Sequence, residues 1–254
     1  MHVHGRLTVA ELIDHFWQHA KCYYRNPDGS SSKELQNFRL ALRPLQDLYG
    51  NSRAAEFGPR KLKAARQDLI NGGATKRRNP EMDVRGGSRM YVNKQIRRVK
   101  LIFKWAVAEE LIPPAVYQSL QAVKGLKRGR CEVRETDPIK PVRQEYVDAI
   151  EPYVSAQVWA LVQLQLLTGA RAGELVLIRA IDIDTSGKIC SYSPVNHKTA
   201  HHGHFRTIYL GPRTQRVLQP FLAGRSVDAY LFPPIEAEAE WRQRLNEPSW
   251  RMMW

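Results

Sequence analysis

The sequence predicts a mainly α protein with one small antiparallel sheet, built as two domains joined by a basic linker. Apolar residues recur at helical spacing through the first half of the 254 residues. After Arg179 the pattern changes to turn residues and two short strand-like runs. Glycine, proline and cations over 124–141 favour an extended, exposed segment. We therefore expect a helical domain over 1–130, a linker over 131–141 and an α+β domain over 142–254.

The first domain is expected to contain four helices, and capping residues mark the start of the first. Thr8, with Glu11 at the capping-box position, predicts where that helix begins. A second helix is expected from about Ser32 to Leu48, where apolar residues have helical spacing. Pro44 lies inside that range, so we expect a kink or an early end there.

Two further helices complete the first domain. The third is predicted from Gly58-Pro59 to Asn71, because proline favours the first helical turn and the glycines that follow favour a helix end. The fourth, from about Met90 to Glu110, has the most regular apolar face. Between them, residues 72–88 are rich in Gly, Lys and Arg and are expected to form a loop.

The second domain is expected to begin with helices and to continue with a hairpin. The expected elements are helices at about 143–151 and 155–167, turn residues at 182–184, strands at Lys188–Ser193 and Phe205–Leu210, and a helix from Gly211. The loop Asn196–His204 joins the two strands. From Pro233 onward the apolar periodicity is weak.

The charge balance indicates a polyanionic partner. Lys and Arg number 39 against 25 Asp and Glu, a formal net charge of +14. Nucleic acid is the usual partner of so basic a chain, although a merely basic globular protein is the plain alternative. No apolar run approaches the roughly 20 residues that span a bilayer, and Cys22, Cys131 and Cys190 are spaced like free thiols. We expect a cytoplasmic protein with no membrane partner.

Two groups of cations are candidate DNA contacts. One lies in the expected loop before the fourth helix, and the other lies on the polar side of that helix with Trp105 among the cations. Such a surface can follow a phosphate backbone, and a solvated basic face is the alternative. The candidate DNA-binding residues are Lys76, Arg77, Arg78, Lys94, Arg97, Arg98 and Lys104.

Phosphate chemistry is one interpretation of the second domain. Arg171 follows a helix-ending Thr-Gly-Ala turn, where a guanidinium can project and bind a phosphate through two hydrogen bonds. Glu174 lies three residues on and could hold it, although a simple surface ion pair is the alternative. Lys198, in the hairpin loop, could protonate a leaving oxygen or be an ordinary exposed lysine.

The same loop holds four histidines, at 197, 201, 202 and 204, which raises the question of a metal. The loop has no acidic or cysteine partner and its spacing matches no structural zinc site. No phosphate-binding loop, dinucleotide fingerprint or zinc-finger spacing occurs elsewhere. We therefore expect no metal and no cofactor.

These residues together resemble a known family. The first catalytic box of the tyrosine recombinases, the phage-integrase type, is similar to Thr168–Leu175 (TGARAGEL) and the Ile181–Asp184 run (IDID) after it. The loop lysine Lys198 and the run Arg206–Leu210 resemble that family's lysine-bearing hairpin. The helical first half resembles its core-binding (SAM-like) domain, and the likeness extends over about 7–232.

The resemblance implies DNA integration or recombination on double-stranded DNA, with other recombinase protomers as further partners. In this family a tyrosine attacks the scissile phosphate and forms a phosphotyrosyl intermediate, so strands are rejoined without ATP or metal. Arg171 matches the first arginine that stabilises the charged phosphate, and Glu174 matches its acidic support. Lys198 matches the lysine that protonates the 5′ oxygen.

The sequence departs from the family in its last part. No histidine occurs over Thr214–Trp254, so the His-x-x-Arg box is missing, and Tyr230 is the only tyrosine there. Tyr230 is expected to be structural. We therefore expect a partial catalytic domain, truncated and unable to cleave DNA alone, with a tail after Arg242 like that left by a frameshift. It should also expose an apolar patch.

Three other interpretations stay open at this point. The chain could be a non-catalytic regulator that occupies recombination sites or disturbs a full-length partner. It could be a poorly folded fragment of a decayed gene. Last, it could be a metalloprotein that uses the histidine loop.

Overall fold

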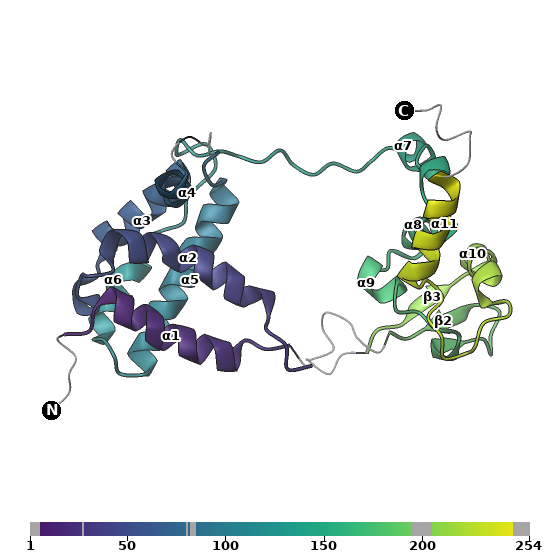
Figure 1. Ribbon diagram of the computed structural model, residues 1–254, viewed down its shortest axis with the longest axis horizontal. Coiled ribbons are helices and arrows are strands. Elements are labelled where there is room, and N and C mark those ends of the chain that lie inside the picture. Colours follow the sequence, from purple (N-terminus) through teal and green to yellow (C-terminus); the bar gives the residue numbers. More distant parts are fainter. Residues whose placement is uncertain (1–5, 27, 80, 82–84, 195–204, 246–254) are drawn as a thin grey trace. The chain divides into compact units, whose positions relative to one another are not determined.

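A computed structural model describes residues 6–26, 28–79, 81, 85–194 and 205–245. The chain divides into two units, Met1–Ile139 and Lys140–Trp254 (Figure 1). Each unit has its own hydrophobic core. The division falls inside the stretch 131–141 that the sequence predicts as a linker. The mainly helical architecture with one small antiparallel sheet is confirmed.

Four long helices form the first unit, as the sequence predicts. They are α1 (Val9–Tyr23), α2 (Lys33–Tyr49), α3 (Pro59–Asn71) and α5 (Arg89–Ala108). Shorter elements lie between and after them, namely η1 (Ala54–Glu56), α4 (Gly73–Arg78) and α6 (Pro114–Gln121). The capping box that starts α1 is present, because Thr8 N donates to Glu11 Oε2 at 2.8 Å and Glu11 N donates to Thr8 Oγ1 at 3.2 Å.

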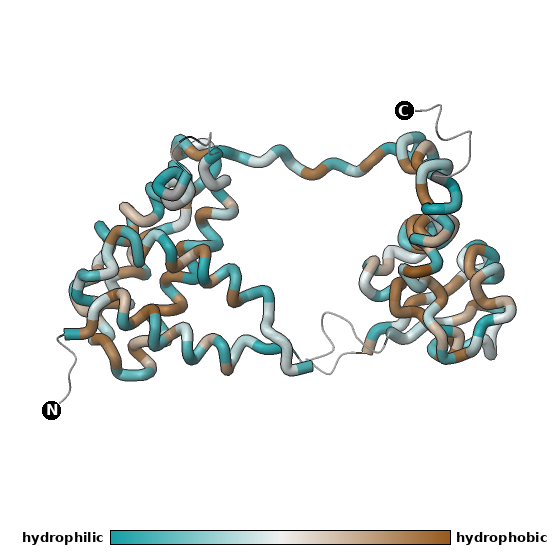
Figure 2. The backbone as a smooth tube through the Cα atoms, in the orientation of Figure 1, coloured by the Kyte–Doolittle hydropathy of each residue, from teal (hydrophilic) through white to brown (hydrophobic). Residues whose placement is uncertain are grey.

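Helix α5 packs against α1, α2, α3 and α6, so it is the centre of this unit. Its apolar face, which includes Val99 and Phe103, is fully buried. Phe57 stacks on Phe103 with ring centroids 4.7 Å apart, and Phe16 meets Phe38 edge to face at 5.0 Å. Figure 2 shows hydrophobic and hydrophilic segments following one another along the helices of this unit.

Two expectations for the first unit need correction. The early end at Pro44 does not occur, because α2 continues to Tyr49 with the proline buried in the core, whereas a kink there stays a prediction. The stretch 72–88 is not all loop, because α4 lies within it. Gly72 ends α3 in the left-handed conformation, at φ 66°, and its carbonyl then accepts from the amides of Thr75 and Lys76 at 3.1 Å, which starts another turn.

The second unit combines short helices with the sheet. Its helical elements are α7 (Gln144–Asp148), η2 (Glu151–Tyr153), α8 (Ala156–Thr168), α9 (Ala172–Leu175), η3 (Ala180–Asp182), α10 (Pro212–Leu222) and α11 (Pro234–Leu245). The strands are β1 (Ile183–Asp184), β2 (Cys190–Tyr192) and β3 (Ile208–Leu210). They pair antiparallel in the order β1-β2-β3, with Tyr192 opposite both Ile183 and Ile208.

Polar contacts explain why α11 has no clear apolar period in the sequence. Glu240 accepts from the amide of Ala156 at the start of α8, at 3.0 Å. Arg244 donates to the carbonyl of Val154 at 2.7 Å. Because these contacts are ionic or go to backbone groups, a search for apolar periodicity could not find the helix.

The expectation of a turn at 182–184 is partly wrong, since β1 covers the last two of these residues.

Several large apolar side chains of the second unit are exposed. They lie at the end of α8, at and after the end of α9, and in η3, and include Leu166 (54% exposed), Leu177 (41%) and Ile181 (62%). The expected apolar patch stays a prediction. Among the described helices, none is both long enough and apolar enough to cross a membrane.

Candidate functional site

A tight turn after α8 positions Arg171. Gly169 takes the left-handed conformation at φ 65°, and its amide donates to the Gln165 carbonyl at 2.8 Å, which ends the helix. The hydroxyl of Thr168 donates to the Leu164 carbonyl at 2.6 Å and accepts from the amide of Ala170 at 3.2 Å. The Thr-Gly pair therefore fixes the direction in which the chain enters α9, and Arg171 lies at that entry.

Glu174 joins two arginines. Its Oε2 accepts from the amide of Arg171 at 2.9 Å, and its Oε1 accepts from the Arg171 guanidinium at 2.8 Å. Arg206, which precedes β3, places its Nε 2.9 Å from the same Oε1. The carboxylate is buried (3% exposed), whereas the side chain of Arg171 is 53% exposed. Glu174 therefore holds the backbone amide and one guanidinium nitrogen of Arg171. The rest of the guanidinium is open to solvent.

The contact with Arg206 is an ion pair and not an aligned hydrogen bond. Among the described residues, the buried Nε–H of Arg206 has no hydrogen-bond partner despite its short distance to Glu174. The remaining guanidinium nitrogens are partly accessible, since the side chain is 33% exposed. The result is two cations at one carboxylate, which together carry more positive charge than it neutralises.

Hydrogen bonds keep Glu174 ionised. Burial disfavours its charged form, but the backbone and side-chain hydrogen bonds from Arg171, with the charges of Arg206 and Arg171, hold its pKa below the ordinary value. Its backbone carbonyl accepts from the hydroxyl of Tyr192 at 2.8 Å. Burial raises the pKa of Tyr192 to about 12, so this buried tyrosine on β2 stays a neutral donor.

The structure brings Arg171 and Glu174 together as the sequence suggests. Lys198 and the four histidines of its loop lie outside the described residues. Sequence reasoning did not select Arg206 as a site residue. A signal was present, because alternate residues of a strand face the same side and Ile208 and Leu210 are buried. That alternation places Arg206 on the inner face, where an arginine needs a partner.

Tyr230 is held by its backbone near the same core. It forms an isolated bridge with Arg179, and its carbonyl accepts from Arg225 at 3.1 Å. Arg179 itself holds Asp182 through two contacts of 2.8 Å at the entry to the sheet. The backbone of Tyr230 is thus paired like that of a strand residue.

In the first unit, one face of α5 carries free cations. Lys94, Arg97 and Lys104 are exposed, with Leu101 between Arg97 and Lys104 and Met90 one turn before Lys94 at helical spacing. No contact to an acidic side chain is found for these three cations within the described part of the chain. Trp105 does not belong to this face, since its ring packs on Phe16 and His19 of α1, at 5.3 and 5.1 Å.

The other candidate cations have different surroundings. Arg98 donates to both oxygens of Glu34, at 2.6 and 3.1 Å. Arg77 bridges Asp47 and Asp68, with contacts of 2.8 and 2.5 Å. Lys76 is exposed on α4, whereas the side chain of Arg78 lies outside the described residues. Arg77 and Arg98 are thus engaged within the unit, which leaves them less available to a phosphate.

Chemically, these arrangements can hold anions. Arg171 with Arg206 offers two guanidiniums at one place, and the α5 face offers a row of three cations. Among the described residues, no group of three or more His, Cys, Asp or Glu side chains is arranged to hold a metal ion.

Comparison with known proteins gives a match at the level of structure only. No protein-family model and no curated protein matches the sequence. A structure of the Tn1549 transposon integrase in complex with a circular intermediate DNA matches with a TM-score of 0.57 and 16% identity, over 87% of this chain and 66% of that one.

Two structures of lambda integrase dimers bound to a COC′ core site are also similar. One matches with a TM-score of 0.60 and 15% identity, over 89% of this chain and 71% of that one. The other has a TM-score of 0.59 and 16% identity, over 89% of this chain and 58% of that one. The chain therefore has the fold of these integrases. It spans about two thirds of the Tn1549 integrase chain and less than two thirds of one of the two lambda integrase chains.

Proposed function

We propose that this chain, which folds like the integrases, is a DNA-binding protein of the site-specific tyrosine recombinase type. The observation that carries the proposal is the pair Arg171 and Arg206 on the buried carboxylate of Glu174. Such a held guanidinium keeps its charge at any working pH and suits a phosphate oxygen. The net charge of +14 supports a polyanionic partner, and the matched integrases are complexes with DNA.

In this proposal the two units bind different phosphates of the DNA. The α5 cations Lys94, Arg97 and Lys104 neutralise backbone phosphates, which gives affinity without sequence preference. Arg171 grips one phosphate through its exposed guanidinium edge, and Arg206 adds a second positive charge beside it. Lys198 is the proposed donor of a proton to the leaving 5′ oxygen, as the family resemblance implies.

We further propose that residues 1–254 do not cleave DNA by themselves. Over Thr214–Trp254 the sequence has no histidine, and its one tyrosine, Tyr230, has its backbone fixed to Arg179 and Arg225. A phosphate held by arginines without a positioned nucleophile is bound but not attacked.

One experiment tests both parts. A gel-shift titration of the chain with a short duplex at several salt concentrations should give a log–log slope near −0.9 for each neutralised phosphate. A suicide substrate, nicked so that a cleaved strand is lost, is then added to the same samples. We expect salt-dependent binding and no covalent band. Absence of binding at low salt refutes the DNA-binding proposal, and a protein–DNA band that survives denaturation refutes the second part.

A second protomer is the further partner that we propose, because Leu166, Leu177 and Ile181 are exposed on the second unit. We propose that these side chains form one apolar patch, and such patches favour association with another protein surface. Sedimentation of the free chain and of the chain with duplex should then show dimers or larger species. A strictly monomeric chain in both samples contradicts this part.

A further inference from the structure

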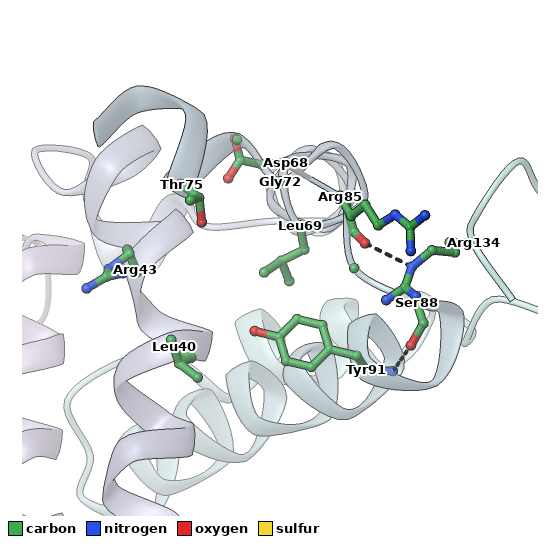
Figure 3. A pocket seen from close by; sticks show the side chains of 13 residues that line it. Leu40, Arg43, Asp68, Leu69, Gly72, Thr75, Arg85, Ser88, Tyr91 and Arg134 are labelled. Atoms are coloured by element: carbon green, nitrogen blue, oxygen red, sulfur yellow. Dashed lines mark hydrogen bonds between the residues drawn. The ribbon is translucent and has the colours of Figure 1, made fainter. Parts of the chain in front are cut away.

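A cavity of about 370 Å³ lies in the first unit, whereas Arg171 and Glu174 belong to the second (Figure 3). It opens beside the start of α5 and reaches α2, α3 and α4. That volume is at the lower end of the range for small-molecule pockets. Its lining includes Leu40, Leu69, Tyr91, Arg85, Arg134 and Asp68.

One part of the cavity is apolar. Leu40 from α2 and Leu69 from α3 line it together with the ring of Tyr91 from α5. Figure 3 shows the Tyr91 side chain extended from its helix into the space between the two leucines. An aromatic face with a phenolic hydroxyl accepts a flat or sugar-like group and can also donate a hydrogen bond to it.

The other part of the cavity is positively charged. Arg85 and Arg134 both line the cavity, and within the described part of the chain neither contacts a carboxylate. The side chain of Arg134 makes one long hydrogen bond within the described ranges, from Nε to the Gly86 carbonyl at 3.4 Å. Asp68 is the acidic residue of the lining, and its carboxylate is occupied by Arg77 at 2.5 Å. A third arginine of the lining, Arg43 of α2, also has no contact to a carboxylate among the described residues.

Backbone contacts hold these two arginines in place. A Cβ on Gly86 would lie 1.7 Å from the carbonyl oxygen of Ile70, so only glycine permits this close approach of the loop to α3. The amide of Gly87 donates to the Leu69 carbonyl at 3.0 Å. Arg134 lies near the end of the first unit in the sequence, and its carbonyl accepts from the amide of Arg89 at 2.9 Å. These contacts fix the backbone at both arginines, whose exposed side chains line the cavity.

We propose that this cavity binds a phosphate group, with the guanidiniums of Arg85 and Arg134 on its oxygens and the group that carries the phosphate against Tyr91. Two adjacent guanidiniums without an acid gain most from an anion with several oxygens, because each can form paired hydrogen bonds to it. The phosphate can belong to a free nucleotide or to the backbone of bound DNA. Only the second source rests on the proposed function.

The test uses the full chain with three probes, namely inorganic phosphate, adenosine monophosphate and a short duplex. Calorimetric titrations compare the wild type with the double variant Arg85→Gln/Arg134→Gln. The matched control is Arg60→Gln/Lys63→Gln, which removes the same charge from exposed positions of α3. Thermal melting checks that each variant folds. If the double variant does not fold, Arg85→Gln alone replaces it, since no contact of that side chain is found among the described residues.

For a nucleotide site, we expect the double variant to lose at least about tenfold in affinity for the monophosphate, and the control to change less than about twofold. For a DNA-backbone site, the free ligands bind weakly or not at all, and duplex affinity falls at least about tenfold in the double variant relative to the control. The first result holds even if the chain does not bind DNA. Equal effects of the double variant and the control on every probe overturn the proposal.

Discussion

Arg171 and Arg206 share one carboxylate oxygen, Oε1 of Glu174, at 2.8 and 2.9 Å, although 35 positions (206 − 171) separate them in the chain. Arg171 comes from the turn after α8, and Arg206 comes from the chain that enters β3. A single buried acid therefore connects the helical part of the second unit with its sheet.

The first prediction concerns Glu174→Gln. The amide keeps the shape of the side chain but removes the charge that both arginines need. We expect a loss of about 1.5–3 kcal/mol in the free energy of unfolding, the range for hydrogen bonds to charged groups. Urea denaturation followed by circular dichroism measures it. The control is Glu151→Gln, an exposed acid of the same unit, and an equal loss there would show that the arginines do not depend on Glu174.

The pH dependence of the same variant gives a second prediction. The pKa of Glu174 is below its ordinary value in the folded chain, so the unfolded chain takes up the proton first as the pH falls. The stability due to Glu174 is then fully present above the unfolded pKa of about 4.3 and is lost as the pH falls through the folded pKa. The difference between wild type and Glu174→Gln should be constant from about pH 7 to pH 5.5 and shrink towards pH 3. A difference that grows on acidification contradicts this assignment.

The third prediction separates Arg171 and Arg206 from general charge. Arg171→Gln and Arg206→Gln should each weaken duplex binding and lower the salt slope by about one, as expected for a lost phosphate contact. Arg213→Gln removes an exposed arginine from α10 of the same unit and is the comparison. If only Arg171→Gln exceeds that control, Arg206 acts on the structure alone and does not contact the phosphate.

The fourth prediction divides the cations of α5 by their surroundings. Combined replacement of Lys94, Arg97 and Lys104 by glutamine should lower the salt slope by about three and leave stability nearly unchanged, since all three are exposed. Arg98→Gln should instead cost up to about 1 kcal/mol of stability by releasing Glu34, with duplex affinity within about twofold of wild type. Gel shifts and urea denaturation measure the two effects. The reverse pattern would mean that Arg98 leaves Glu34 when DNA binds.

The sequence predicted most helices because their apolar faces are periodic and their ends carry capping residues. Thr8 with Glu11, and Gly58 with Pro59, mark helix starts where the structure has them. Helices α4 and α11 were missed because polar contacts hold them, through Arg77 in one case and Glu240 with Arg244 in the other. A period of apolar residues carries no information about such contacts.

The candidate site divides in a similar way. Arg171 and Glu174 are three positions apart, so local spacing alone allows their contact. The contact of Arg206 with Glu174 depends on how the sheet returns to α9, which no local pattern fixes. The cavity between Tyr91 and Arg134 depends likewise on a segment far along the chain that packs back on the start of α5. Such sites depend on contacts between distant segments, which local sequence patterns do not predict.

The last prediction tests the turn that positions Arg171. In Gly169→Ala the added Cβ meets no atom within 4 Å, so the cost comes only from the left-handed backbone at φ 65° and should be about 1–2 kcal/mol. Gly173→Ala is a matched control, because its Cβ also meets nothing within 4 Å and it lies in α9 without a positive φ. There alanine should be neutral or stabilise by up to about 1 kcal/mol. Urea denaturation should therefore show a loss of stability in Gly169→Ala and no loss in Gly173→Ala, and duplex affinity should fall only in Gly169→Ala. Equal changes in both would mean that the conformation of Gly169 does not hold Arg171 in place.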